Sequence, residues 1–308
     1  MIIRRLAPLA LLAVAAFWVL RPDGGRALLA RPDTCGDSAA VSWSPGSPQQ
    51  GALFRVRVVG VAPDVRLAGE VAGEPLHFAP ASETSGARES FAAVPIEGDT
   101  ALMISVRCVA GNSSDSLSAL VVAARAAYPV ERLRVAPVFG RPPDSALAAR
   151  TRRESQRAVE VARASHGTPR LWRDAFQLPR ASRVTSGFGH GREFNGAITS
   201  RHMGTDFAGA TGSPVAAANR GVVRIVDAFH YGGNVIYLDH GHGLTSAYLH
   251  LSEQLVSEGD TVERGQTIGS VGATGRVTGP HLHLIVRYGG VTVDPLSLFA
   301  IAGDASGG

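Results

Sequence analysis

The stretch Pro280-His281-Leu282-His283 begins an apolar segment that is predicted to form a β-strand to about Arg287. Proline restricts the backbone where the segment begins. Residues two apart on a strand project to the same face, so His281 and His283 share one face while Leu282 points into the core. Two imidazoles on one face of an apolar strand carry a desolvation cost unless a ligand or a reaction uses them. Alone, this His-x-His pattern also fits a purely structural role.

Two other patterns add groups of the same chemistry. His202-Met203-Gly204-Thr205-Asp206 places an imidazole and a carboxylate four residues apart, and Gly204 favours a strand end over a helix. Both side chains are good zinc ligands. Tyr248-Leu249-His250-Leu251 places a further histidine at the end of a predicted strand. Each pattern by itself is a weak signal.

Together the patterns predict a metal site with acid–base chemistry. Eight of the ten histidines fall between His190 and His283. A catalytic zinc usually takes three protein ligands and leaves one position for water. We therefore expect three ligands and two unliganded imidazoles, which the spacing alone does not assign. The five candidate side chains are His202, Asp206, His250, His281 and His283.

The surrounding segment, residues 179–300, is rich in glycine and predicted to be β-structured. No long amphipathic helix separates its strands, which argues against parallel βαβ units. The strand candidates are Val222–Val226, Val235–Leu238, Thr245–Leu249, Thr267–Val271 and His283–Arg287.

The first half of the chain predicts two further parts. Phe54, Val56 and Val58 alternate with arginines, which is typical of a half-buried strand. With turn signals throughout, residues 35–127 are expected to form a small β-sandwich. Residues 128–178 are expected to form a charged helical connector that starts near Pro142–Ser145.

The two cysteines, Cys35 and Cys108, lie outside any metal-binding spacing. In an exported protein such a pair predicts a disulfide, and two unpaired buried thiols are the alternative. Export is predicted by residues 1–21, in which Arg4 and Arg5 precede an apolar run over residues 6–20. This segment is either a cleaved signal peptide or an uncleaved membrane anchor.

The arrangement of the basic residues argues against one class of partner. The formal net charge is +4 and every basic residue is arginine. The sequence contains no basic helix, no arginine run with interleaved aromatic residues and no zinc-finger spacing. We therefore expect no nucleic-acid partner. Arg192 and Asn195 precede the first candidate ligand. They are candidates to contact a substrate carboxylate or amide, with an ordinary surface loop as the alternative.

Six segments together resemble a known family. They are Ser186-Gly187-Phe188-Gly189, His202–Asp206, Gly212-Ser213-Pro214-Val215, Tyr248–Ser252, Gly259-Asp260 and Gly275–His283. Their order and spacing over about residues 179–300 resemble the lysostaphin/LytM-type zinc endopeptidases. The preceding β-sandwich and connector are similar to the N-terminal region of some exported bacterial members.

The resemblance implies a mainly β protein whose C-terminal domain is an antiparallel fold with a groove. It implies that His202, Asp206 and His283 bind one Zn²⁺, and that His250 and His281 are catalytic. It further implies hydrolysis of peptidoglycan peptide cross-links by an exported enzyme of the periplasm or cell envelope, with peptide stems as substrate. A non-catalytic activator or wall-binding regulator of other hydrolases is the alternative, and a regulatory protein partner is conceivable in either case.

Overall fold

The computed structural model describes residues 25–27, 34–81, 86–139, 142–196 and 198–303. The predicted export segment, residues 1–21, lies outside these described residues. Within them, no helix combines the length and the hydrophobicity needed to cross a bilayer.

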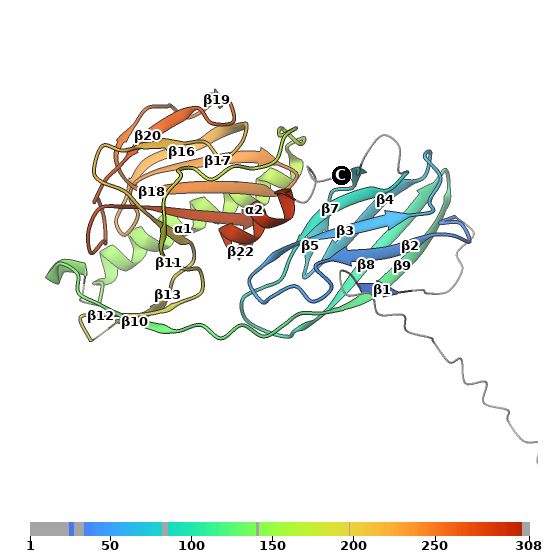
Figure 1. The fold of residues 1–308 in the computed structure, drawn as a ribbon, viewed down its shortest axis with the longest axis horizontal. Coiled ribbons are helices and arrows are strands. Elements are labelled where there is room, and N and C mark those ends of the chain that lie inside the picture. The colour runs from blue at the N-terminus through green and yellow to red at the C-terminus, as the bar shows by residue number, and fades with distance from the viewer. Residues whose placement is uncertain (1–24, 28–33, 82–85, 140–141, 197, 304–308) are drawn as a thin grey trace, which may run out of the picture.

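The N-terminal part is a sandwich of two antiparallel sheets, as the sequence predicted (Figure 1). The first sheet has the order β1 (Gly25–Ala27), β2 (Ala40–Ser44), β3 (Leu53–Val59), β7 (Arg88–Ala93) and β6 (Ala79–Pro80). The second has the order β5 (Glu74–Leu76), β4 (Arg66–Val71), β8 (Ala101–Ala110) and β9 (Ser113–Val122). On β3 the alternating Phe54, Val56 and Val58 are all buried, because they face the opposite sheet.

A disulfide joins Cys35 to Cys108, which confirms the predicted pairing. Cys35 precedes β2 of the first sheet, and Cys108 lies on β8 of the second. Both residues belong to the buried core between the sheets. The bond therefore links the two layers of the sandwich covalently.

The connector contains a strand as well as the predicted helix. Its elements are β10 (Val130–Leu133), η1 (Pro137–Phe139), α1 (Ser145–Ala164) and η2 (Ser165–Gly167). Asp144 caps α1 by accepting a hydrogen bond of 2.8 Å from the backbone N–H of Leu147. The sequence predicted this helix start but gave no sign of β10, which runs from the sandwich to the C-terminal domain (Figure 1).

The C-terminal domain is built on a ten-stranded antiparallel sheet, which confirms the predicted fold class. Its main path is β11 (Val184–Ser186), β14 (Thr205–Ala208), β21 (His281–Tyr288), β18 (Leu244–Gln254), β17 (Gly233–Gly241), β16 (Gly221–Phe229) and β19 (Thr261–Val262). Three strands lie off this path: β15 (Pro214–Ala216), β20 (Thr267–Val271) and β22 (Val291–Val293). A small sheet of β10, β12 (Gly191–Phe194) and β13 (Ile198–Arg201) lies beside it, and α2 (Pro295–Gly303) ends the described chain.

Apolar side chains cover both faces of the large sheet. On one face, Ala158 of α1 packs with Ile225, Val235 and Tyr237. The other face buries a larger cluster that includes Trp172 of the extended segment after η2. Because both faces are covered, the central strands hold their positions rigidly, and polar side chains at their ends have fixed directions.

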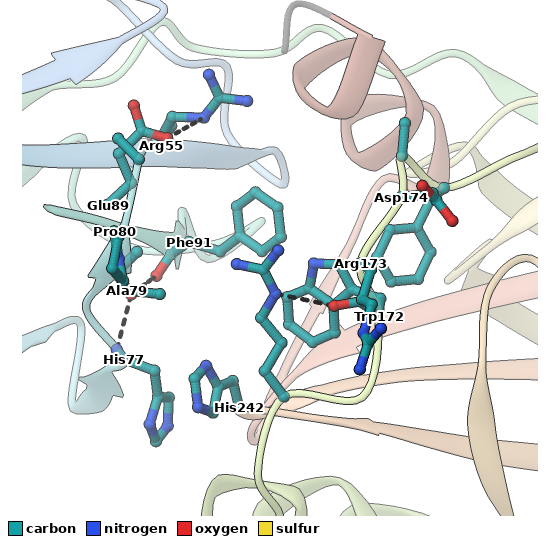
Figure 2. A pocket seen from close by; sticks show the side chains of 15 residues that line it. Arg55, His77, Ala79, Pro80, Glu89, Phe91, Trp172, Arg173, Asp174 and His242 are labelled. Carbon is teal, nitrogen blue, oxygen red and sulfur yellow. Dashed lines mark hydrogen bonds and ion pairs between the residues drawn. The ribbon is translucent and has the colours of Figure 1, made fainter. Parts of the chain in front are cut away.

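The two domains are packed together as well as linked by the connector. Ser297 of α2 accepts a hydrogen bond of 2.8 Å from the backbone of Leu53 in the sandwich. Figure 2 shows a pocket at this junction, where His77 lies beside His242 and Phe91 faces Trp172. The two imidazole rings stack with centroids 4.7 Å apart, and the Phe91 and Trp172 rings are 6.0 Å apart and nearly parallel.

We expect His240 to make the folded protein less stable in acid. Its ring is fully buried, its Nδ1 donates to the carbonyl of Arg220 at 2.8 Å, and its Nε2 lies 2.8 Å from the hydroxyl of Ser246. Burial lowers the pKa of His240 from its usual 6.5 to about 4. The unfolded chain therefore binds a proton that the folded chain excludes between these values, and stability is lost as the pH falls from about 6.5 toward 4.

The loss attributable to His240 is on the order of 3 kcal/mol at most. Denaturant unfolding at pH 7.5 and pH 5 measures it. A His240→Asn variant keeps an N–H donor but does not titrate, so its stability should fall less between the two pH values. An equal fall in both proteins would contradict the expectation.

Candidate metal and catalytic site

Strand pairing brings the separate histidine patterns together. On β14 and β21, Asp206 lies directly opposite His283 in the antiparallel register. On the other side of β21, Leu249 of β18 lies opposite His283, and His250 follows it. The strand that carries His281 and His283 therefore lies between the strand of Asp206 and the strand of His250. This order is why residues up to 81 positions apart meet at one point.

Three of the candidate side chains converge in the buried interior of the site. Nε2 of His202 lies 3.0 Å from Oδ1 of Asp206 and 2.9 Å from Nδ1 of His283, and that Nδ1 lies 2.6 Å from Oδ1. Among the described residues, these three are the one group of three or more His, Cys, Asp or Glu side chains whose ligand atoms all lie within 4.8 Å of one another.

Hydrogen bonding assigns the proton on His202. Its Nδ1 lies 2.7 Å from the carbonyl oxygen of Gly187, which can only accept, so Nδ1 carries the hydrogen. The other nitrogen, Nε2, then presents a lone pair toward a carboxylate oxygen of Asp206 and a ring nitrogen of His283. Lone pairs that face one another in a buried site repel unless a cation lies between them. The set therefore fits a divalent metal, for which imidazole and carboxylate are common ligands.

The electrostatic surroundings give Asp206 and His283 the charge states that metal binding needs. Burial alone raises the pKa of Asp206, but the polar and charge interactions with the adjacent rings of His202 and His283 outweigh it and hold that pKa far below its usual range. Burial lowers the pKa of His283 to about 4. Asp206 is thus an ionised carboxylate and His283 a neutral imidazole, the forms that bind metal without first losing protons.

His250 and His281 lie beside this group with matching orientations. Nδ1 of His250 donates to the carbonyl of Thr274, and Nδ1 of His281 donates to that of Gly279, both at 2.8 Å. In the neutral form of each ring, Nε2 is therefore the nitrogen without a hydrogen. The two ring centroids are 4.9 Å apart, and Nε2 of His281 lies 3.6 Å from Oδ1 of Asp206.

The backbone of His250 is in the left-handed region, with φ of 63°. Such a conformation is uncommon for residues other than glycine and costs on the order of 1–3 kcal/mol. It occurs where β18 shifts register against β17 and β20. The irregularity turns the ring of His250 toward the metal ligands, and the bond from its N–H to Gly232 helps to hold it there.

A network of polar side chains surrounds the predicted ligands. Nη2 of Arg192 donates to Oδ2 of Asp206 at 2.7 Å and to the hydroxyl of Ser186 at 3.1 Å. That hydroxyl donates to Glu131 at 2.9 Å, and Nδ1 of His190 donates to the same carboxylate at 2.8 Å. Glu131 lies on β10, in the connector, where no sequence pattern predicts a role at the site.

The two residues predicted to contact substrate face different partners in the structure. Arg192 contacts Asp206 as described above. The side-chain amide of Asn195 exchanges two hydrogen bonds of 3.0 Å with the backbone of Val135. It therefore fastens the connector to the C-terminal domain. A substrate role for either residue stays a prediction.

A groove of about 320 Å³ opens beside the three converging residues. Asp206 and His281 line this groove together with Glu131, Arg192 and Arg276. The guanidinium of Arg276 lies 4.0 Å from the ring centroid of Phe194 and 4.3 Å from that of Tyr231. Among the described residues no carboxylate pairs with Arg276. Arg276 belongs to the Gly275–His283 motif, whose pattern assigns no role to this residue.

Comparison with known proteins agrees with this geometry. Residues 200–295 match the model for Peptidase family M23. A segment of 88 residues is 52% identical to the peptidoglycan DD-endopeptidase ShyA of Vibrio cholerae, covering 28% of this chain and 20% of that protein. A segment of 116 residues is 42% identical to ShyB of the same organism, covering 37% of this chain and 27% of that protein.

These matches span only about a fifth to a quarter of the curated relatives. A crystal structure of a Pseudomonas aeruginosa protein assigned to peptidase M23 superposes with a TM-score of 0.60 at 22% identity, over 82% of this chain and 95% of that one. The likeness extends beyond the matched segment and concerns the fold alone. The family match and the identity to named endopeptidases are therefore what make residues 200–295 of this chain similar to Peptidase family M23.

Proposed function

We propose that the chain is a zinc-dependent endopeptidase that hydrolyses peptide cross-links of bacterial peptidoglycan. The observation that carries the proposal is the convergence of His202, Asp206 and His283 beside a groove that Asp206 lines. Two further imidazoles with assigned protons, those of His250 and His281, stand beside them.

In this proposal the ligand atoms are Nε2 of His202, Oδ1 of Asp206 and Nδ1 of His283. When bound, a zinc ion polarises the carbonyl of the scissile bond and lowers the pKa of a water molecule held beside it. Two neutral nitrogens and one carboxylate oxygen leave a net positive centre, which suits that chemistry. The donor set is also the kind that zinc prefers over magnesium or calcium.

His250 and His281 supply the acid–base chemistry. Because Nδ1 of each ring donates to a backbone carbonyl, Nε2 is the nitrogen that can accept a proton from the attacking water. Burial lowers the pKa of His250 well below its usual value, so its ring is neutral before the reaction. Once protonated, an imidazole at this position can deliver the proton to the leaving amine and stabilise negative charge on the carbonyl oxygen.

The groove and the relatives support a peptidoglycan substrate. The matched Vibrio cholerae proteins are named peptidoglycan DD-endopeptidases. Arg183 and Arg276 line the groove without carboxylate partners among the described residues. They suit the carboxylates of peptide stems, since guanidinium matches carboxylate geometry. Such a substrate also requires export to the cell envelope, with residues 6–20 as a leader or an anchor.

Loss of a ligand should abolish both metal binding and activity. We expect the purified wild-type chain to bind a single zinc ion, and His283→Ala to bind none under the same conditions. Wild type should release cross-link fragments from purified sacculi, detected by mass spectrometry, and should leave casein intact. A wild type without zinc that stimulates another hydrolase would favour a regulatory function, and casein cleavage would favour another substrate.

Loss of an acid–base histidine should lower the turnover rate without changing zinc binding. The His281→Ala variant should retain its zinc, because His281 is not among the three converging ligands. Its kcat on a cross-linked muropeptide should fall about 10²- to 10⁴-fold, the usual contribution of a general acid or base. Zinc content measured on the same sample is the control. An unchanged kcat would argue against a catalytic role for this ring.

Arg276 should matter for substrate binding. The variant Arg276→Met keeps an apolar stem between Phe194 and Tyr231 but removes the charge. We expect KM for a stem peptide with free carboxylates to rise about 10- to 100-fold, with little change in kcat, as for a lost charged hydrogen bond. A substrate with amidated carboxylates is the control. An equal rise in KM for both substrates would show that Arg276 does not bind the carboxylate.

A further inference from the structure

We infer that Glu131, which the connector supplies from outside the matched M23 segment, is a positioning residue for the metal site. It acts through Arg192, which holds the carboxylate of Asp206 in the orientation that binds the ion. The inference rests on the proposed function, since it concerns the affinity of the site for that ion.

The two oxygens of Asp206 have different partners. Oδ1 faces His202 and His283, at 3.0 Å and 2.6 Å. Oδ2 accepts a hydrogen bond of 2.7 Å from Nη2 of Arg192. Arg192 thereby prevents the carboxylate from rotating and leaves one oxygen for the metal. Such outer contacts orient metal ligands, and their loss typically costs 10- to 100-fold in metal affinity or activity.

Arg192 in turn depends on Glu131 for its charge balance. Its side chain is only 16% exposed, and its Nε lies 3.4 Å from Oε2 of Glu131. That Nε is buried and forms no hydrogen bond, so the contact is an ion pair at a distance. Burial alone raises the pKa of Glu131, but hydrogen bonds from His190 and Ser186 and the charge of Arg192 lower it. Glu131 is therefore ionised and offsets a cation that would otherwise face the metal uncompensated.

A second contact leads from Glu131 to another ligand. The hydroxyl of Ser186 donates its single hydrogen to Glu131 at 2.9 Å, so it accepts from Nη2 of Arg192 at 3.1 Å. The same oxygen lies 3.2 Å from Nδ1 of His202. Glu131 thus supports the surroundings of two predicted ligands, Asp206 and His202, through a single hydroxyl and a single guanidinium.

The strand that carries Glu131 is held at both ends, so the carboxylate is fixed in place. On the paired strands β10 and β12, Glu131 lies directly opposite Arg192 in the parallel register. Before β10, the hydroxyl of Tyr128 donates to the carbonyl of Gln50 in the sandwich at 2.7 Å. After β10, Asn195 exchanges its two hydrogen bonds with Val135. Figure 1 shows this segment passing from the sandwich to β12.

Glu131 also lines the groove, so a different role has to be separated from positioning. If its carboxylate mainly obstructed substrate, removing the charge would raise activity and leave metal affinity unchanged. If it positions Arg192, removing the charge lowers metal affinity. The two roles predict opposite results for the same variant.

The test compares Glu131→Gln with a matched control on the same pair of strands. Glu193 and Arg132 form the next cross-strand pair, 3.6 Å apart, and Arg132 is 84% exposed. Glu193→Gln therefore removes an equivalent charge without touching the ligand network. Zinc dissociation constants are measured on full-length proteins by competition with a chromogenic chelator. We expect Glu131→Gln to bind zinc 10- to 100-fold more weakly than wild type, and Glu193→Gln to match wild type.

A second variant distinguishes a positioning effect from a folding defect. Arg192→Lys should weaken zinc binding to a similar degree, because an ammonium cannot contact Asp206, Ser186 and Glu131 together. The double variant should lose less than the product of the two single losses, because both residues act through one path. Added zinc should restore part of the activity of Glu131→Gln, and the metal-free variants should unfold at the wild-type midpoint.

Two results would overturn the inference. Wild-type zinc affinity in Glu131→Gln, with or without raised activity, would show that Glu131 does not position the site. Equal weakening in Glu193→Gln would show a general effect of charge. A wild-type chain that binds no zinc would instead overturn the proposed function, so the two failures are distinguishable.

Discussion

The site depends on the antiparallel register between β14 and β21. That register places Asp206 directly opposite His283, and because side chains alternate along a strand, His281 falls on the same face as His283. A shift of one residue would turn both imidazoles into the core and bring Leu282 to the groove. The register is secured by the apolar side chains of Phe207 and Leu282, which are buried on the opposite face. Packing and function are therefore specified by the same pairing.

Backbone carbonyls determine what each histidine can do. Three rings, those of His202, His250 and His281, donate Nδ1–H to a carbonyl of a loop residue and keep Nε2 unprotonated. His283 differs, because it faces Asp206 through Nδ1. The loops that supply these carbonyls thus have a chemical role, since they set the tautomer of each ring before any ligand arrives.

Much of this arrangement could be predicted from sequence because it follows local rules. Alternation on the strand of Phe54 and the cap at Asp144 each depend on neighbouring residues, and the structure confirms both. The clustering of the histidines predicted a shared metal site, but the assignment of ligands and catalytic rings came from the resemblance, because spacing alone does not pair strands. Glu131 could not be found in this way. Its segment pairs in parallel with β12, some 60 residues later, and no local pattern encodes that partner.

The site therefore includes residues outside the segment that matches the family in sequence. The match begins at residue 200, yet the groups that surround Asp206 include Ser186 and Arg192, which precede it, and Glu131, which belongs to the connector. The connector is also fastened to the sandwich through Tyr128. Any movement of the sandwich that displaced β10 would withdraw the charge that balances Arg192. On the inference drawn for Glu131, the position of the N-terminal domain and the metal affinity of the site are coupled through one strand and one ion pair.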